Sequence, residues 1–157
     1  MLSRVVHVVK LFRIRDETFA NPVDVPSVMP GFAAALLAFT SPGDGVVLQP
    51  PVYPPFFEVT ESLDRRVIHN FLKFDGSWHM DLEGLKGLLS SAKAFLLCSP
   101  HNPVGRVWSE EELSALSSMC AKAGVPVLSD EIHCDFVYRG YKHIPIASIN
   151  HEAAMNT

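Results

Sequence analysis

Cysteine is scarce in this sequence, and long apolar runs are missing. The three cysteines, Cys98, Cys120 and Cys134, form no CxxC pair and no zinc-ligand spacing. This pattern argues against a disulfide framework and indicates reduced intracellular thiols. No apolar run reaches membrane-spanning length, and the first residues lack the apolar core and the cleavage site of a signal peptide. These absences predict a cytoplasmic protein without a membrane partner.

The sequence also lacks long runs of charged residues of one sign. No block of like charge exceeds three residues, and the net charge is -4 with a pI near 5.9. This balance argues against nucleic acid as a partner. Apolar residues make up 48% of the 157 residues and charged residues 19%, which is typical of one globular domain with a real core.

What the chain does contain is a regular alternation of strand and helix patterns, punctuated by 12 prolines. Helices are predicted at residues 33–39, 54–64, 81–92 and 109–124, and strands at 45–50, 65–74, 94–100 and 125–132. Several of these strands are apolar on both faces, which is typical of a parallel sheet covered by helices. The predicted fold class is therefore α/β, with three α/β/α layers and a mostly parallel sheet.

The helix at 109–124 carries the strongest boundary signals. Ser109 followed by Glu112 three residues later predicts a capping box, and Gly124 predicts the C-terminal stop. The residues that precede it, "SPHNPVGRVW", place an Asn between two prolines at the end of an apolar strand. Pro100 and Pro103 restrict the backbone on both sides of Asn102, so its side chain is expected to be held in one direction.

Three predicted strands are followed by polar residues: Tyr53, Asn102 and Asp130. In open α/β sheets the ligand crevice lies beyond the carboxyl ends of the strands. Each residue also has a simpler explanation, because Asn beside Pro is a common turn residue, an acid after a strand is often an N-cap, and a loop Tyr often only packs. Their shared position at strand ends suggests one common site.

The motifs "PGDGVVLQPPVYPPF", "SPHNPVGRVW" and "DEIHCDFVYRGYKHIPIAS" together resemble the fold-type I enzymes that depend on pyridoxal 5'-phosphate, the aminotransferase class I/II superfamily. Within it they resemble the cystathionine β-lyase, or carbon–sulfur β-lyase, subgroup. The resemblance runs from about residue 29 to residue 149. It implies a cofactor, pyridoxal 5'-phosphate, and a small amino-acid substrate.

The resemblance also implies a role for each strand-end residue. Tyr53 would stack on the pyridine ring, and Asn102 would donate a hydrogen bond to the phenolate oxygen O3′. Asp130 would pair with the pyridine nitrogen and keep it protonated, because a carboxylate beside that nitrogen raises its pKa. His133 replaces the Tyr of most aminotransferases, as in the lyase-like subgroup; its ring could contact O3′ or Asp130, or it could be a partly exposed loop residue.

The phosphate is expected at the start of a helix, where backbone amides bind anions. On the resemblance, Gly31 would allow close approach of the backbone, and Phe32 and Ala33 would offer N–H groups. The segment from Gly31 to Pro42 is about one helical turn shorter than the family pattern. No catalytic residue and no metal ligand is predicted.

The family also needs a lysine that holds the cofactor as a Schiff base. None of the lysines lies in the expected Ser-x-x-Lys-like context; they are Lys10, Lys73, Lys86, Lys93, Lys122 and Lys142. The chain is therefore expected to be a fragment of the large domain, with an atypical segment at residues 1–25 and a partial cofactor-binding domain at 26–157. Full-length relatives are expected to be homodimers.

Three functions remain open at this point. The first is a β-lyase that removes a proton from Cα of cystathionine or another S-substituted cysteine and releases the thiol, pyruvate and ammonia. The second is an aminotransferase of the same fold. The third is a non-catalytic remnant without the Schiff-base lysine.

Overall fold

The apolar runs form a four-stranded sheet in the computed structural model, which describes residues 25–157. All three strand pairings are parallel. In spatial order the strands are β2 (Arg66–His69), β1 (Gly45–Leu48), β5 (Ala92–Cys98) and β6 (Val127–Asp130). A separate two-stranded antiparallel sheet consists of β3 (Lys73–Phe74) and β4 (Trp78–His79).

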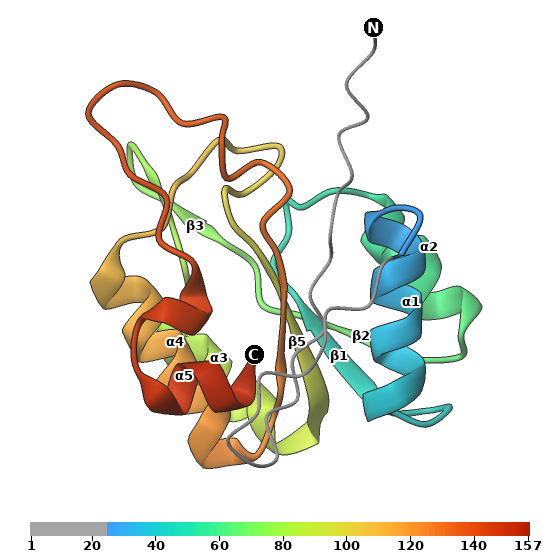
Figure 1. The fold of residues 1–157 in the computed structure, drawn as a ribbon. Coiled ribbons are helices and arrows are strands. Elements are labelled where there is room, and N and C mark those ends of the chain that lie inside the picture. Colours follow the sequence, from blue (N-terminus) through green and yellow to red (C-terminus); the bar gives the residue numbers. More distant parts are fainter. Residues whose placement is uncertain (1–24) are drawn as a thin grey trace, which may run out of the picture.

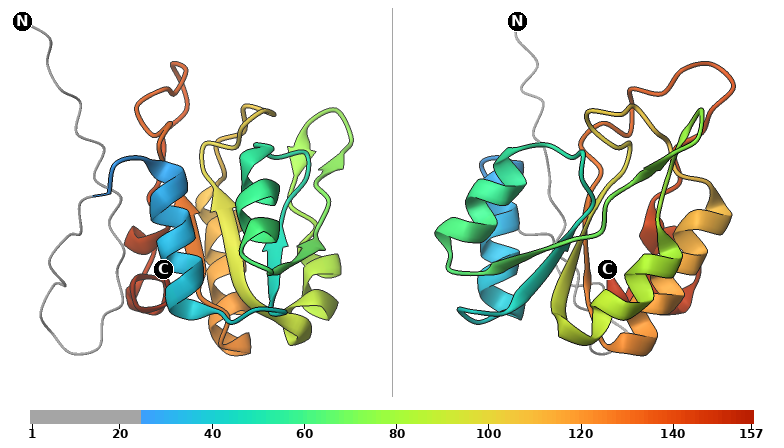
Figure 2. Two further views of the ribbon diagram at one scale, coloured as in Figure 1. Left: turned by 90° about the vertical axis from the view of Figure 1, so that its right-hand side faces the viewer. Right: turned by 180° about the vertical axis from the view of Figure 1, so that it is seen from behind.

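Helices cover both faces of the parallel sheet, as Figures 1 and 2 show. One face carries α1 (Val28–Phe39) and α2 (Pro55–Ser62). The other carries α3 (Leu82–Leu88), α4 (Glu110–Ala123) and α5 (His151–Asn156), with two short 3₁₀ turns, η1 (Leu89–Ser91) and η2 (Ile146–Ser148). The predicted three-layer α/β/α class is confirmed. The predicted segment at residues 1–25 lies outside the described residues except for Val25, and the boundary at residue 26 stays a prediction.

Two separate cores form because neighbouring side chains of a strand point to opposite faces of the sheet. Val46 and Leu48 pack toward α1 and α2, whereas Val47 packs with the leucines of α3 and α4. In the same way Leu96 and Leu97 of β5 belong to different cores. Strands buried on both faces must be apolar at nearly every position, which explains the continuous apolar runs.

The capping signals of α4 act as predicted. The Ser109 hydroxyl accepts the Glu112 N–H at 3.2 Å, and the Glu112 carboxylate accepts the Ser109 N–H at 2.9 Å. Gly124 ends the helix with φ of 67°, a left-handed conformation that costs glycine little. Local sequence therefore determines both ends of this helix.

The prediction of one strand over residues 65–74 was wrong. β2 ends at His69, and β3 pairs antiparallel with β4 instead of continuing in the sheet. The buried side chain of Asn70 lies at this break: its Oδ1 accepts from Gln49 Nε2 at 2.9 Å, and its Nδ2 donates to the Asp81 carbonyl at 3.0 Å. The backbone N–H groups of Asn70 and Leu72 still donate to the Leu48 and Pro50 carbonyls, so the chain stays beside the end of β1 before it enters β3.

The strand order creates a switch point between β1 and β5. From β1 the chain crosses through α2 to β2 on one side, and from β5 it crosses through α4 to β6 on the other side. The crossovers therefore run in opposite directions and leave a crevice beyond the carboxyl ends of β1 and β5. The fold places its natural ligand site at this position.

Candidate functional site

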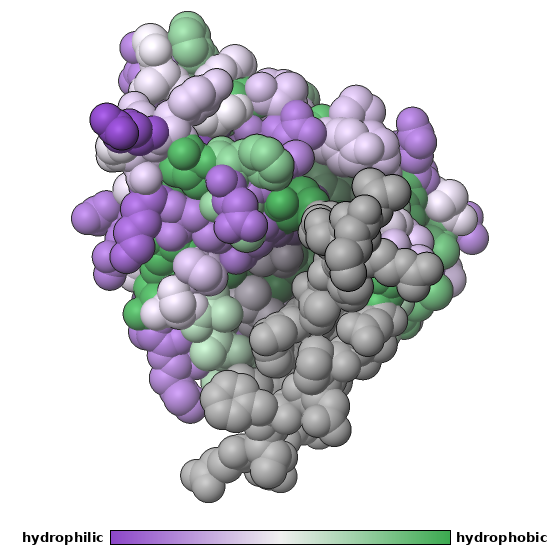
Figure 3. Space-filling model, turned by 45° about the horizontal axis from the view of Figure 1, so that its top comes forward, coloured by the Kyte–Doolittle hydropathy of each residue, from purple (hydrophilic) through white to green (hydrophobic). Residues whose placement is uncertain are grey.

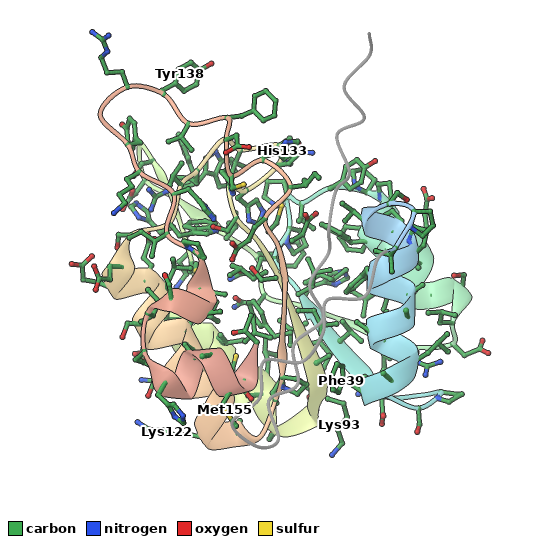
Figure 4. All side chains as sticks on the ribbon, in the orientation of Figure 1. Phe39, Lys93, Lys122, His133, Tyr138 and Met155 are labelled. Carbon is green, nitrogen blue, oxygen red and sulfur yellow. The ribbon has the colours of Figure 1, made fainter. Side chains whose placement is uncertain are left out.

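A pocket of about 390 Å³ opens at the switch point. This volume falls in the range of small-molecule sites. The pocket brings together all four strand-end and loop residues predicted from the sequence: Tyr53, Asn102, Asp130 and His133. Figure 3 looks onto this end of the molecule, where apolar and polar side chains are mixed on the uncovered surface. In Figure 4, His133 lies at this end, far from Lys93 and Lys122 at the opposite end.

Asp130 is the last residue of β6 and lies next to the end of β5. Its backbone carbonyl accepts the Ser99 N–H at 2.9 Å, and its Oδ1 accepts the Ile132 N–H at 3.1 Å. Burial raises the pKa of the Asp130 carboxyl, and the Ile132 hydrogen bond and the charge of His133 oppose that shift only in part. Within residues 25–157 no lysine or arginine forms an ion pair with Asp130. A cation in the pocket would compensate the negative charge of this carboxylate.

Asn102 belongs to the turn after β5, residues 99–108, hereafter the β5 turn. Its backbone N–H lies 3.4 Å from the Cys98 sulfur, and the Cys98 thiol donates to the Pro100 carbonyl at 3.5 Å. The side-chain amide of Asn102 makes no hydrogen bond to any residue that the structure describes. It is therefore available to a ligand in the pocket.

Tyr53 belongs to the loop after β1, residues 49–54, hereafter the β1 loop. Its ring packs edge-on against Phe56 of α2, with 5.6 Å between centroids and an interplanar angle of 84°. The residue is 39% exposed and lines the pocket, so part of its ring can be reached by a ligand there. The long apolar side chain of Phe56 is fully buried and supports Tyr53 from behind.

His133 belongs to the loop after β6, residues 131–145, hereafter the β6 loop. Its ring lies 6.2 Å from that of Phe136, and its imidazole makes no hydrogen bond to any described residue, whereas its backbone carbonyl accepts the Phe136 N–H at 2.8 Å. The base of the loop is fastened by the Glu131 carboxylate, which accepts from His143 Nε2 at 3.0 Å and from the Ile146 N–H at 3.1 Å. His133 therefore stands on a loop that is anchored at its base.

The structure does not bring Gly31, Phe32 and Ala33 to the pocket. Helix α1 begins at Val28, so these three residues lie inside the helix, and the Gly31 N–H already donates to the Ser27 carbonyl at 3.2 Å. The ring of Phe32 packs on Phe56, 5.4 Å away, in the core. The predicted helix start was too late, since the apolar period becomes clear only after Pro30.

The helix terminus that does line the pocket consists of Ser27, Val28 and Met29. The first N–H groups of a helix have no partner within it and carry partial positive charge, so they bind anions. Sequence reasoning missed these residues and also Cys98. Pro30 is the signal that could have located them, because proline is tolerated in the first turn of a helix.

The described lysines do not line the pocket. Lys73 pairs with Asp81 at 2.8 Å, and Lys86 pairs with Glu83 at 2.6 Å. Within residues 25–157 there is also no group of three or more potential metal-binding side chains, and no helix there is long and apolar enough to cross a membrane. The first residues of α1 do line the pocket.

A parallel α/β/α sheet with polar strand-end residues around a pocket at its switch point is the arrangement in which α/β domains bind small ligands. The chain belongs to the aminotransferase class I and II family, which matches residues 19–156.

Cystathionine beta-lyase PatB from Bacillus subtilis is 47% identical over 140 residues, which are 85% of this chain and 36% of PatB. The crystal structure of cystalysin from Treponema denticola, which contains a pyridoxal 5'-phosphate cofactor, matches with a TM-score of 0.80 and 40% identity over 83% of this chain and 34% of that one. Human kynurenine–oxoglutarate transaminase 1 is 32% identical over 76% of this chain and 32% of its own length. The chain thus spans about a third of the length of these relatives.

Proposed function

We propose that this chain is part of a carbon–sulfur β-lyase, and that the pocket between Tyr53, Asn102, Asp130 and His133 binds pyridoxal 5'-phosphate. One observation carries the proposal. The pocket collects a half-buried carboxylate without a cationic partner, an amide and an imidazole without hydrogen bonds to described residues, and a helix N-terminus. A ligand with a cationic ring nitrogen, a phenolate and a phosphate has a complementary group for each.

Asp130 would hold the ring nitrogen. A protonated pyridine nitrogen beside the carboxylate would compensate the charge that burial disfavours, and the pKa of Asp130 would then fall. The hydrogen bond from the Ile132 N–H keeps the carboxylate oriented. When bound, the cofactor would supply an electron sink for the electron pair that remains at Cα after proton removal.

Asn102 and Tyr53 would orient the ring. The side-chain amide of Asn102 would donate to the phenolate oxygen, and the partly exposed ring of Tyr53 would stack on the cofactor ring. The N–H groups at the start of α1, near Ser27 and Met29, would hold the phosphate. His133 has a free ring nitrogen that could bind either the phenolate oxygen or Asp130.

Three observations support a lyase over other chemistry at this site. His133 occupies the position where the lyase-like subgroup carries His, and the chain reads "PPVYPPF" from the β1 loop into α2. Among the relatives, PatB is a cystathionine beta-lyase at 47% identity, whereas the human transaminase is 32% identical. Because a transaminase is also among the relatives, aminotransfer is the second candidate function.

Binding of pyridoxal 5'-phosphate to the chain, followed by quenching of protein fluorescence, tests the site. We expect saturable binding that Asp130→Asn weakens at least tenfold, because asparagine cannot compensate a cationic nitrogen. Asp135→Asn is the matched control, because Asp135 is an exposed acid in the adjoining β6 loop that does not line the pocket. Equal affinity of the wild type and the Asp130→Asn variant would refute the assignment.

The reaction is tested in the protein to which these residues belong, with cystathionine as substrate. Release of pyruvate without an added keto acid is the expected result. Keto-acid-dependent amino transfer without pyruvate would reverse the order of the two candidates. A homodimer and a cytoplasmic location belong to the same proposal on the strength of the family resemblance, and sedimentation and cell fractionation would test them.

A further inference from the structure

His101 precedes Asn102, and no role has so far been assigned to it. Its side chain is 1% exposed, and its Nε2 lies 3.0 Å from the carbonyl oxygen of Pro51 in the β1 loop. A carbonyl oxygen only accepts hydrogen bonds, so Nε2 must carry the proton. The two residues are 50 positions apart in the sequence. This bond therefore joins two loops that lie on opposite sides of the switch point.

The backbone of His101 also closes the turn that carries Asn102. Its N–H donates to the Arg106 carbonyl at 2.7 Å, and its own carbonyl accepts the Gly105 N–H at 2.7 Å. Gly105 adopts φ of 70°, which lets the chain reverse there without strain. One residue thus closes the β5 turn with its backbone and fastens that turn to the β1 loop with its side chain.

The imidazole is held from behind by Trp108. The two rings meet edge to face, with centroids 5.3 Å apart and an interplanar angle of 79°. Trp108 is itself fixed, because its Nε1 donates to the Cys98 carbonyl at 2.9 Å and its side chain is 1% exposed. The ring of His101 therefore has one orientation, aimed at Pro51.

The protonation state of His101 agrees with this geometry. Its Nδ1 is buried and has no partner among the described residues, so a proton there would be an unsatisfied buried donor. Burial lowers the pKa of His101, which keeps the imidazole neutral. A neutral ring with its proton on Nε2 is the form that the hydrogen bond to Pro51 requires.

We infer that His101 is a positioning residue, which couples the β1 loop to the β5 turn and so sets the spacing between Tyr53 and Asn102 across the pocket. The inference rests on the proposed function of that pocket. Burial alone could be achieved by a leucine, whereas the cross-loop bond needs a side-chain donor. Tyr53 is two residues from Pro51 and Asn102 is next to His101, so the bond joins the two backbone segments that carry these residues.

Two variants at this position separate coupling from packing. His101→Leu keeps a buried side chain but removes the donor, and His101→Gln keeps an amide that can donate to the Pro51 carbonyl. We expect His101→Leu to weaken binding of pyridoxal 5'-phosphate about five- to tenfold, and His101→Gln to restore it to within about twofold. Leu116→Ala is the control, since it opens a cavity under α4, a helix that does not line the pocket, and should leave the affinity unchanged.

Two NMR readouts need no cofactor. The imidazole nitrogens of the wild type should show the tautomer protonated at Nε2 and bare at Nδ1. The ring signals of Tyr53 should shift in His101→Leu and return toward the wild type in His101→Gln. The inference would be overturned if the proton were on Nδ1, or if the ring signals of Tyr53 stayed unchanged in both variants.

The outcomes also distinguish this inference from the proposed function. If the wild type does not bind pyridoxal 5'-phosphate, the proposed function fails, and the tautomer and the Tyr53 signals still decide whether the loops are coupled. If His101→Leu does not fold, the glutamine variant and the wild-type tautomer decide. If the leucine, glutamine and Leu116→Ala variants weaken binding by the same factor, His101 serves packing alone.

Discussion

The two loops that follow neighbouring strands β5 and β6 are built differently. The β5 turn is closed by its own backbone bonds and locked by Trp108, and the Arg106 guanidinium binds both carboxylate oxygens of Glu112 at 2.8 and 2.7 Å. The β6 loop is fastened at its base by Glu131, and its outer part exposes Phe136, Tyr138 and Tyr141.

The pocket is therefore lined by one loop with many internal bonds, the β5 turn, and by one loop that is held mainly at its base, the β6 loop. Asn102 stands on a turn whose geometry is determined by its own bonds and by the cap of α4. His133 stands on a loop that is fastened at its base and exposes the aromatic side chains of its outer part. We therefore expect Asn102 to be preorganised, and His133 to settle when a ligand or another part of the protein contacts the β6 loop.

The largest contrast between the two loops should appear in their aromatic residues. Trp108→Ala removes a buried ring and the bond to the Cys98 carbonyl, and should lower the free energy of unfolding by about 3–5 kcal/mol. Tyr138→Ala removes a side chain that is 88% exposed and should change it by less than about 0.5 kcal/mol. Urea unfolding measures both. Similar losses for the two variants would mean that the β6 loop is as firmly packed as the β5 turn.

A smaller effect is expected at the base of the β6 loop. Glu131→Ala leaves the Ile146 N–H and the His143 ring without their acceptor, which should cost about 1–3 kcal/mol. Glu131→Gln keeps one acceptor oxygen and should cost less. Amide exchange at Ile146 and proteolysis within residues 135–142 should both become faster, while Gly105 exchange stays slow.

Glu61→Ala is the control for this variant, because Glu61 is an exposed acid on α2. It should alter neither exchange nor proteolysis. Unchanged exchange at Ile146 in Glu131→Ala would show that something other than this carboxylate anchors the loop.

The smallest effect concerns Asp130, which lies between the two loops. Burial raises its pKa in the folded chain above the ordinary value of 3.8, so the folded chain binds more protons than the unfolded chain just above that pH. Stability contributed by this group is therefore lost as the pH rises from 3.8 through the raised pKa. Asp130→Asn should melt at a higher temperature than the wild type at neutral pH, and the difference should shrink below pH 3.8.

The matched Asp135→Asn variant should show no such pH-dependent difference, because that acid is exposed. A lower melting temperature of Asp130→Asn at neutral pH would mean that the carboxylate is already compensated in the chain. The expected gain in stability accompanies the loss of cofactor affinity, which is the usual conflict between a stable fold and a functional buried charge.

Much of the fold could be predicted because its signals are local. The apolar runs became β1, β5 and β6, the capping box and Gly124 bounded α4, and the polar residues at strand ends came together in one pocket. Because the carboxyl ends of parallel strands lie at one edge of the sheet, Tyr53, Asn102 and Asp130 could be placed at that edge from the sequence alone.

The remaining features depend on contacts between distant residues. At the break after β2, the Asn70 side chain bonds to Gln49 and to Asp81, in two other parts of the chain. The tie between His101 and Pro51 spans 50 residues. Periodicity and capping rules have no means of detecting such pairs.

The sequence by itself determined the α/β pattern, the two ends of α4 and the residue types at the carboxyl edge, since hydrophobic periodicity and capping act within a few residues. Only the tertiary structure decided that Ser27 and Met29 at the start of α1, rather than Gly31, line the pocket. It also decided that the β5 turn is tied to the β1 loop through His101, and that the β6 loop is held at its base by Glu131. The physical reason is the same in each case. Buried polar groups must find partners, and in a folded chain those partners come from segments far apart in sequence.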